Sequence, residues 1–173
     1  MKLAGLAAAA AALTFAGAAI AEPAPPPRPG PPPPPARGPA MALALEAAQT
    51  AIATCAANGY KVTAIVVDSS GAERVLLAAD GAPAMTAGFG LRKAFTAVTF
   101  KKPSGAVGED AKTDKALADR IAGDPKLITW AGAQPLTVGG EVIGALAVSG
   151  APGGDKDDAC TSAGIAKVKD RLK

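Results

Sequence analysis

The chain has 173 residues, with 18 Lys and Arg against 15 Asp and Glu, two Cys and no His, which fits one modest domain with extensions. Without imidazole, the sequence excludes His-dependent catalytic triads, His-containing zinc sites and the commonest axial ligand of haem. The near balance of charge argues against a dedicated nucleic-acid binder.

The N-terminus has the pattern of a secretory signal peptide over residues 1–21. Lys2 gives a short positive start, Leu3 to Gly17 is apolar, and Ala19-Ile20-Ala21 supplies the small residues that signal peptidase requires. A retained membrane anchor is the alternative, although the stretch is short and rich in alanine for spanning a bilayer. We therefore expect a periplasmic or secreted protein that has no membrane segment after cleavage before Glu22.

Residues 22–40 have the composition of a proline-rich linker, since 11 of the 16 prolines of the chain lie between Pro23 and Pro39. Proline cannot donate the backbone hydrogen bonds of helix or sheet, so this run favours extended polyproline II. We interpret it as a stiff, solvated spacer. The alternative is a docking ligand for an aromatic-lined groove on a partner.

The composition of a folded domain begins after this linker and continues over residues 41–173, which is long enough for one hydrophobic core. Its first predicted element is a helix, because apolar residues recur at steps of three and four. This apolar stripe consists of Leu45, Ala48, Ile52 and Cys55. The Asn-Gly pair that follows ends the helix, and Cys55 is expected on its buried face.

A hairpin and a second helix follow. Residues 60–68 are rich in β-branched side chains, 69–71 form a Ser-Ser-Gly turn, and 73–79 supply a second strand. Residues 86–99 have helical periodicity, which Lys102-Pro103 closes because the residue before proline is disfavoured in the helical region.

The second half of the domain alternates short elements with glycine-rich turns. They are a loop at 104–111, a polar helix at 112–122, short strands at 127–130 and 135–138, a central strand at 141–149, and a final helix with Asp155 as its cap and Asp158 in its first turn. Because hairpins dominate this order, we predict one α/β (α+β) domain, with an antiparallel sheet of about five strands flanked by helices.

The two cysteines, Cys55 and Cys160, are expected to form a disulfide. Export would place them in an oxidising compartment, where a single intramolecular pair is the default. They can meet only if the first and last helices pack side by side. The alternative, a redox-active pair, lacks the Cys-x-x-Cys spacing.

Several motifs in residues 41–173 resemble the GlcG/HbpS haem-binding family. They are Val66-Val67-Asp68-Ser69-Ser70-Gly71, Arg92-Lys93-Ala94, Gly140-Glu141-Val142-Ile143-Gly144-Ala145, Val148-Ser149-Gly150, and Asp155-Lys156-Asp157-Asp158-Ala159-Cys160 with Ala163-Gly164-Ile165. The resemblance implies a profilin-like domain that assembles into symmetric homo-oligomers. In some members it implies haem bound at the surface or between subunits, whereas other members sit beside glycolate-utilisation or cobalamin enzymes.

The sequence departs from the family pattern at two places. Members often carry a His-Thr pair just before the Arg-Lys helix, where this chain has Met85-Thr86. The glycine-rich segment ahead of the family's Pro-Leu is also altered, to Ala131-Gly132-Ala133-Gln134-Pro135-Leu136. A ligand position has therefore changed, and the altered loop is expected to be stiffer.

The helix predicted at 86–99 presents two stripes when plotted at 100° per residue. One stripe consists of Leu91, Phe95 and Val98, and the other of Met85, Phe89, Arg92 and Thr96. We predict that the first stripe packs in the core. The second is the candidate haem-contact face, and its alternative is a face that packs on a neighbouring subunit.

Each residue of the candidate face offers a contact that haem can use. Met85 has a thioether that can ligate iron, Phe89 a ring that can pack on a porphyrin, and Arg92 a guanidinium suited to a propionate. Lys93 and Thr96 are additional amine and hydroxyl donors. Because a lone thioether is a weak ligand for ferric iron, weak or absent haem binding is an alternative outcome.

Two other groups of polar residues have structural explanations. Asp155, Asp157 and Asp158 could form a calcium loop, but their spacing is not that of an EF-hand, and helix capping explains the acids. Ser149 has no His to activate it as a nucleophile and is expected to be a turn residue. We predict no catalytic residue.

Three functions are therefore weighed from sequence. The leading hypothesis is an exported, non-catalytic haem- or tetrapyrrole-binding protein for haem or iron handling or sensing. The second is an enzyme or accessory subunit that degrades haem or acts on a small hydroxy acid, with Arg92 and Lys93 holding a carboxylate. The third is a structural oligomer whose ligand site has decayed.

Overall fold

The computed structural model describes residues 35–173. The predicted signal peptide (1–21) and most of the proline-rich linker lie outside the described residues, so these two assignments remain predictions. Within residues 35–173, no helix combines the length and the apolar character needed to cross a membrane.

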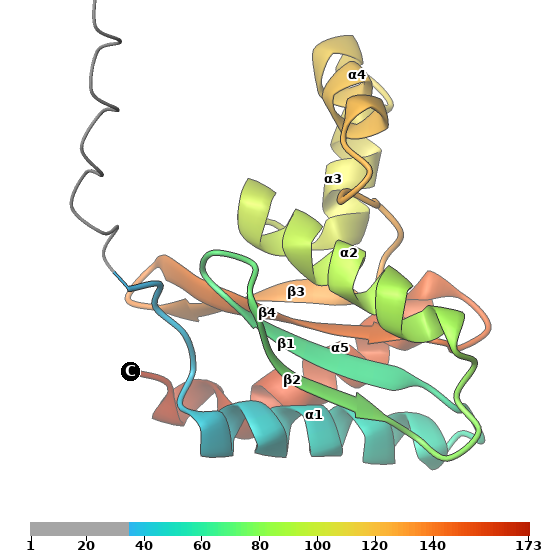
Figure 1. Ribbon diagram of the computed structural model, residues 1–173, viewed down its shortest axis with the longest axis vertical. Helices are drawn as coiled ribbons and strands as arrows, with labels where there is room; N and C mark the ends of the chain where they lie inside the picture. The colour runs from blue at the N-terminus through green and yellow to red at the C-terminus, as the bar shows by residue number, and fades with distance from the viewer. Residues whose placement is uncertain (1–34) are drawn as a thin grey trace, which may run out of the picture. The chain divides into compact units, whose positions relative to one another are not determined.

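One antiparallel sheet with helices on both faces makes up the described domain (Figure 1). In chain order its elements are α1 (Met41–Ala56), β1 (Thr63–Asp68), β2 (Glu73–Ala78), α2 (Met85–Phe100), α3 (Ser104–Ala111), α4 (Lys115–Gly123), β3 (Ala133–Val138), β4 (Glu141–Ser149), α5 (Gly154–Val168) and the 3₁₀ helix η1 (Lys169–Arg171). The strand order is β2-β1-β4-β3, with every neighbouring pair antiparallel. The predicted fold class is confirmed, with a sheet of four strands.

The two central strands are buried on both faces, which explains their continuous aliphatic composition. Along β1, Ala64 and Val66 belong to one core cluster, while Ile65 and Val67 belong to another on the opposite face. All six residues of β1 are buried. α1 and α5 cover one face, and α2 covers the other (Figure 1).

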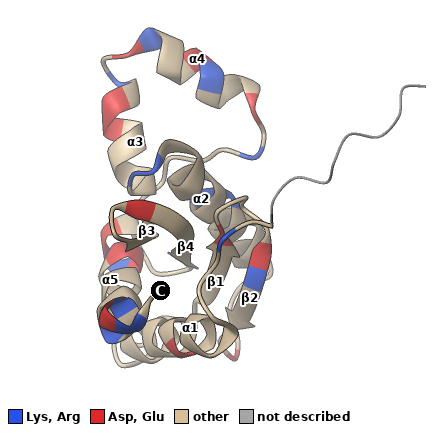
Figure 2. Cartoon of the chain, turned by 90° about the vertical axis from the view of Figure 1, so that its left-hand side faces the viewer, with Lys and Arg blue, Asp and Glu red and all other residues tan. Residues whose placement is uncertain are grey.

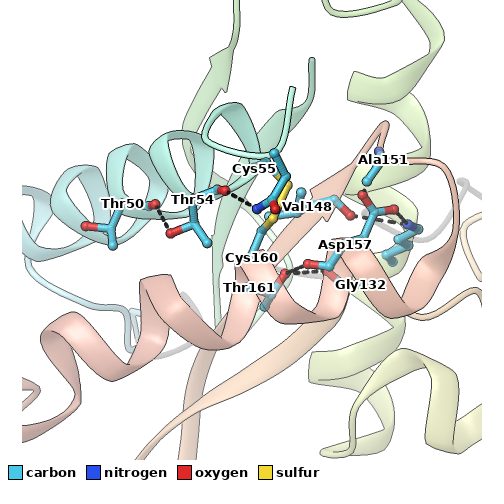
Figure 3. The surroundings of a disulfide bond; sticks show 11 residues. Thr50, Thr54, Cys55, Gly132, Val148, Ala151, Asp157, Cys160 and Thr161 are labelled. Carbon is cyan, nitrogen blue, oxygen red and sulfur yellow. Dashed lines mark hydrogen bonds and ion pairs between the residues drawn. A yellow bond between two sulfur atoms is a disulfide. The ribbon is translucent and has the colours of Figure 1, made fainter. Parts of the chain in front are cut away.

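Close contact between α1 and α5 closes the first face. A Cβ placed on Gly164 would lie 2.5 Å from the carbonyl oxygen of Ala47, so the two helix backbones approach where neither has a bulky side chain. The disulfide Cys55–Cys160 joins the same helices, with its Cα atoms 5.6 Å apart (Figure 3). The predicted pairing and the burial of Cys55 are both confirmed.

The buried stripe of α1 differs from the predicted one. Ala44, Ala47 and Ala51 are at most 1% exposed, whereas Leu45 is 36% exposed. Since α1 lies so close to its neighbours, the small residues face the core and Leu45 is displaced to the rim.

On α2 the predicted core stripe is only partly buried. Ala94, Ala97 and Val98 pack in the core, and Gly90 lets the helix approach β1, because a Cβ there would lie 2.8 Å from Cδ1 of Ile65. Leu91 and Phe95 are half-buried instead. The helix meets the sheet through its smallest residues, which leaves two larger apolar side chains at its side.

Residues 127–130 are not a strand, which corrects the predicted count of about five. Several of their backbone groups bond to side chains of α2 and α3 instead of to a neighbouring strand. Thr96 Oγ1 accepts the N–H of Ile128 at 3.0 Å, and Arg92 Nη2 donates to the carbonyl oxygen of Leu127 at 2.8 Å. With these groups already bonded, the segment crosses the side of α2 as an irregular strip.

Two further predictions need correction. The predicted loop at 104–111 is the helix α3, which projects with α4 from the α2 side of the domain (Figure 1). The cap of α5 is Gly153, whose φ of 129° favours glycine, while Asp155 lies exposed inside the helix. The other two acids at the start of α5 bond within the fold: Asp158 Oδ1 accepts the N–H of Gly132 at 3.0 Å, and Asp157 pairs with Lys93.

Candidate functional site

A groove of about 360 Å³ lies beside the N-terminal half of α2. One wall is formed by Met85 and Phe89 of α2 together with Trp130, and the other by the 149–154 loop that leads into α5. We call this feature the Met85 groove. Met85 is 67% and Trp130 is 57% exposed, so two large apolar side chains stand open to solvent at its rim.

The aromatic wall of the Met85 groove is a tilted ring pair. The centroids of Phe89 and Trp130 are 5.1 Å apart, with 53° between the ring planes. This is within the range of favourable edge-to-face contacts. Each ring therefore restrains the other and presents apolar surface to a ligand.

A buried ion pair forms the polar base of the groove. Lys93 is 2% exposed, and its Nζ donates to Asp157 Oδ2 at 2.8 Å and to the carbonyl oxygen of Val148 at 3.2 Å. Asp157 Oδ1 also accepts the N–H of Ala151 at 2.9 Å (Figure 3). These bonds tie α2, β4 and α5 together at one point.

The ion pair also sets the charge of the groove. Burial raises the pKa of the Asp157 carboxyl, against the opposing effect of its bonds from Lys93 and the backbone. Among the described residues, Lys93 is the one basic side chain that lines the groove, and Asp157 the one acidic side chain. The Met85 groove thus carries little net charge, and its main attraction for a ligand is apolar.

The structure brings together three of the five predicted cofactor-binding residues. Met85, Phe89 and Lys93 line the Met85 groove, whereas Arg92 lines a separate hollow on another side of α2. Thr96 is fully buried, and its hydroxyl donates to the Arg92 carbonyl oxygen at 2.9 Å while accepting the N–H of Ile128. Because Arg92 and Lys93 face different hollows, they do not clamp one carboxylate.

The division of the predicted stripe has a simple cause. Met85 is 67% exposed and Phe89 is only partly covered, by the ring of Trp130, whereas the backbone of the strip at 127–130 crosses the helix at Arg92 and Thr96. Helical periodicity gives the direction of a side chain about the axis, but it says nothing about which part of the stripe another segment covers.

Sequence reasoning missed two parts of the Met85 groove. Trp130 falls in the segment predicted as a strand at 127–130, and local pattern gave no sign that its ring would stand 57% exposed beside Phe89. The 149–154 loop was interpreted only as a turn. Its glycines at 150 and 153 both have φ of 129°, so the backbone takes a conformation that larger residues rarely adopt.

Comparison with known proteins gives one family and several solved structures. The family model described as "Haem degrading protein HbpS-like" matches residues 40–166. The crystal structure of HbpS is 32% identical with a TM-score of 0.69, over 75% of this chain and 89% of that one. A double mutant of Streptomyces reticuli HbpS is 31% identical with a TM-score of 0.70, over 81% and 99% of the two chains.

A more distant structure shares the fold. The complex of PduOC with haem is 21% identical and has a TM-score of 0.70, over 78% of this chain and 96% of that one. No curated protein sequence matches the chain.

Proposed function

Because the chain belongs to the HbpS-like family, we propose that it binds haem or a related tetrapyrrole in the Met85 groove. It would do so as an exported, non-catalytic protein of haem or iron handling or sensing. Family membership agrees with the resemblance found in the sequence. The observation that carries the proposal is the open apolar rim of Met85, Phe89 and Trp130 above a neutral ion pair.

The side chains of the groove fit a flat, largely apolar macrocycle. Phe89 and Trp130 supply apolar contact, and Met85 supplies a thioether within the same groove. The first N–H groups of α5, beginning at Gly154 on the opposite wall, can donate to a carboxylate of the ligand. Bound haem supplies a redox-active iron, and a thioether ligand favours its reduced form.

Titration of the purified protein with haemin tests this proposal. We expect a shifted Soret band and quenching of Trp130, the single tryptophan of the chain, since haem absorbs its emission. Met85→Ala should weaken both signals, while Met41→Ala, which removes a methionine 73% exposed at the start of α1, should change neither. A free-haemin spectrum at micromolar protein would contradict the proposal.

Export is the second part of the proposal. The support is the pattern of residues 1–21, a positive start, an apolar stretch and a small-residue end. Expression of the full chain should yield a secreted or periplasmic product whose mass corresponds to a first residue of Glu22. Retention of the complete N-terminus in a membrane fraction would instead support the anchor alternative.

Self-association is the third part of the proposal. α4 has no buried residue in the described domain, and it projects with α3 away from the sheet (Figures 1 and 2). A helix whose apolar side chains, such as Leu117 and Ile121, are only partly buried in its own subunit is available to pack against a second copy. Light scattering on the purified protein should give a mass of at least two chains, and a monomer would contradict this.

Haem degradation is the alternative function, and the description of the matching family model favours it. Degradation consumes oxygen and an electron donor, whereas simple binding consumes neither. We expect the Soret band to persist when ascorbate and air are added to the haem complex. Progressive loss of the band with release of iron would favour the enzyme instead.

A further inference from the structure

A second hollow, of about 470 Å³, lies on another side of α2 and has no part in the proposed haem site. It is lined by Leu91, Arg92 and Phe95 of α2, by the 70–72 turn between β1 and β2, and by Pro125 and Lys126. We call it the Arg92 hollow. Its volume is in the range of sites for small molecules.

The floor of the Arg92 hollow is apolar and closely fitted. Leu91 and Phe95 are half-buried there, and Leu91 also packs against the edge of the core beneath α2. Gly71 lies against the Phe95 ring, since a Cβ at this glycine would be 2.4 Å from Cδ2 of the ring. With a φ of 82°, Gly71 holds the turn over the edge of the ring, so the hollow has a defined wall.

The charge of the Arg92 hollow is positive. Arg92 and Lys126 line it, and no acidic residue between positions 35 and 173 does. None of the ion pairs formed within residues 35–173 includes either cation. The Lys126 ammonium lies 5.8 Å from the centroid of the Phe95 ring, so one charge stands directly beside the apolar floor.

Arg92 is held in place and still has donors to offer. Its Nη2 donates to the carbonyl oxygen of Leu127 at 2.8 Å, which fixes the guanidinium. Its Nε is buried and has no hydrogen-bond partner among the described residues. Buried polar groups are normally bonded, and this Nε is enclosed by protein atoms, so the donors left for a ligand are those of the guanidinium Nη groups.

We propose that the Arg92 hollow binds a small organic monocarboxylate with an apolar body, such as an aryl carboxylate. The carboxylate accepts from Arg92 and is attracted by Lys126, while the body packs on Leu91 and Phe95. A guanidinium matches a carboxylate through paired N–H donors. Inorganic phosphate is a poorer fit, because the remaining lining offers it little beyond the hydroxyl of Ser70.

Fluorine NMR titration of the purified protein with 4-fluorobenzoate tests this inference. We expect saturable binding that weakens as salt is added, because the attraction includes an exposed charge. 4-Fluorobenzamide, which has the same shape without the charge, should bind about tenfold more weakly. Phosphate at equal concentration should not displace the benzoate. Equal binding of the amide, displacement by phosphate, or no saturation at millimolar ligand would each overturn the proposal.

Variants locate the binding in the hollow. Arg92→Gln should weaken benzoate binding by about tenfold or more, and Lys126→Gln, at an exposed residue whose loss does not threaten folding, should weaken it severalfold. Arg120→Gln is the matched control, because Arg120 also lies over a ring, 4.8 Å from the centroid of Phe100, outside the hollow. Unchanged binding in Lys126→Gln, or an equal loss in Arg120→Gln, would contradict the assignment.

The test is separate from that of the haem proposal. Haemin titration of Lys126→Gln should match that of the unchanged protein, since Lys126 does not line the Met85 groove. Benzoate binding in Met85→Ala should likewise be unchanged. Failure of either ligand therefore leaves the result for the other intact.

Discussion

The two faces of the sheet are covered in different ways. On one face, α1 and α5 lie close together over a large aliphatic core and are joined by the disulfide. On the other face, α2 lies alone over a smaller core made mainly of alanine and valine. Both hollows, the Met85 groove and the Arg92 hollow, open beside α2.

This difference assigns most of the stability to the α1 and α5 face and the candidate ligand sites to the α2 face. Two helices can shield one face of a small sheet, while a single helix leaves its two sides open unless loops fill them. The open sides require polar anchors, which here are the Lys93–Asp157 pair and the bonds of Arg92 and Thr96 to the strip at 127–130. Changes on the α1 and α5 face should therefore alter stability with little effect on ligands.

The largest expected effect is that of removing the disulfide. Cys55→Ala with Cys160→Ala opens a loop whose ends are 105 residues apart, and the chain-entropy relation gives a loss of about 4–5 kcal/mol in the free energy of unfolding. Urea denaturation measures this loss, and reduction of the unchanged protein is the control. Haemin binding by the folded fraction should be preserved. A loss below about 1 kcal/mol would show that the helices alone close this face.

The next effect concerns the polar anchor of the α2 face. Lys93→Met leaves Asp157 buried without its cation, which should cost about 3–5 kcal/mol. Lys102→Met is the control, since Lys102 pairs with Asp110 at 2.7 Å in an exposed setting, where such pairs contribute about 1 kcal/mol or less. Combining Lys93→Met with Asp157→Leu should restore part of the stability. If Lys93→Met and Lys102→Met lowered the free energy of unfolding equally, the buried pair would contribute no more than an exposed one.

Replacing single glycines by alanine tests how tightly the helices pack on each face of the sheet. Gly164→Ala places a methyl group 2.5 Å from the backbone oxygen of Ala47, which cannot move independently, and should cost about 1–3 kcal/mol. Gly90→Ala meets the end of the Ile65 side chain at 2.8 Å, which can rotate away, so its cost should be smaller. Gly88→Ala, in open space on α2, should stabilise the protein by about 0.5–1 kcal/mol. The reverse order in thermal unfolding would show that the α2 face is the tighter one.

Local pattern was sufficient to predict α1, the β1–β2 hairpin, α2, β4 and α5, but not α3, the irregular segment at 127–130, or which residues face the core. Helices α1 and α2 are present nearly as predicted, yet they approach the sheet through alanine and glycine, and Leu45, Leu91 and Phe95 are displaced to their sides. Hydrophobicity ranks leucine above alanine for burial. How closely two elements approach depends on the shape of both packing surfaces. The apolar stripe of one helix gives no information about the surface that it will meet.

The candidate site shows the same limit. The stripe from Met85 to Thr96 is continuous in the sequence, and the strip at 127–130 divides it into an open part and a covered part. That strip was predicted to be a strand because its composition suits one. Its backbone bonds to Arg92 and Thr96 instead, a choice that depends on residues about thirty positions away and therefore is not visible in local propensity.

The smallest effect concerns the pH dependence of two buried carboxyls, which should have opposite signs. Burial raises the pKa of Asp157 above 3.8. Between 3.8 and that raised value the folded state binds more protons than the unfolded state, so stability falls as pH rises. For Asp68, burial opposes ionisation, but bonds from Ser70 and Ala72 and the charge of Arg74 outweigh it and lower the pKa. Its contribution is present above pH 3.8 and is lost as pH falls through the lowered value.

Urea denaturation across acidic pH separates these two carboxyls. Asp157→Asn should remove a decline in stability that begins just above pH 3.8, and Asp68→Asn should remove a loss that begins below it. Each slope is at most about 1.4 kcal/mol per pH unit, because a single proton is involved. The sign is the sharper result. Burial outweighs the bonds that the Asp157 carboxylate accepts, so ionisation destabilises the fold there, whereas the turn that bonds Asp68 makes its ionisation stabilising. If both variants changed the profile on the same side of pH 3.8, Asp157 would behave like Asp68. Burial would then not be the main influence on the carboxyl at the base of the Met85 groove.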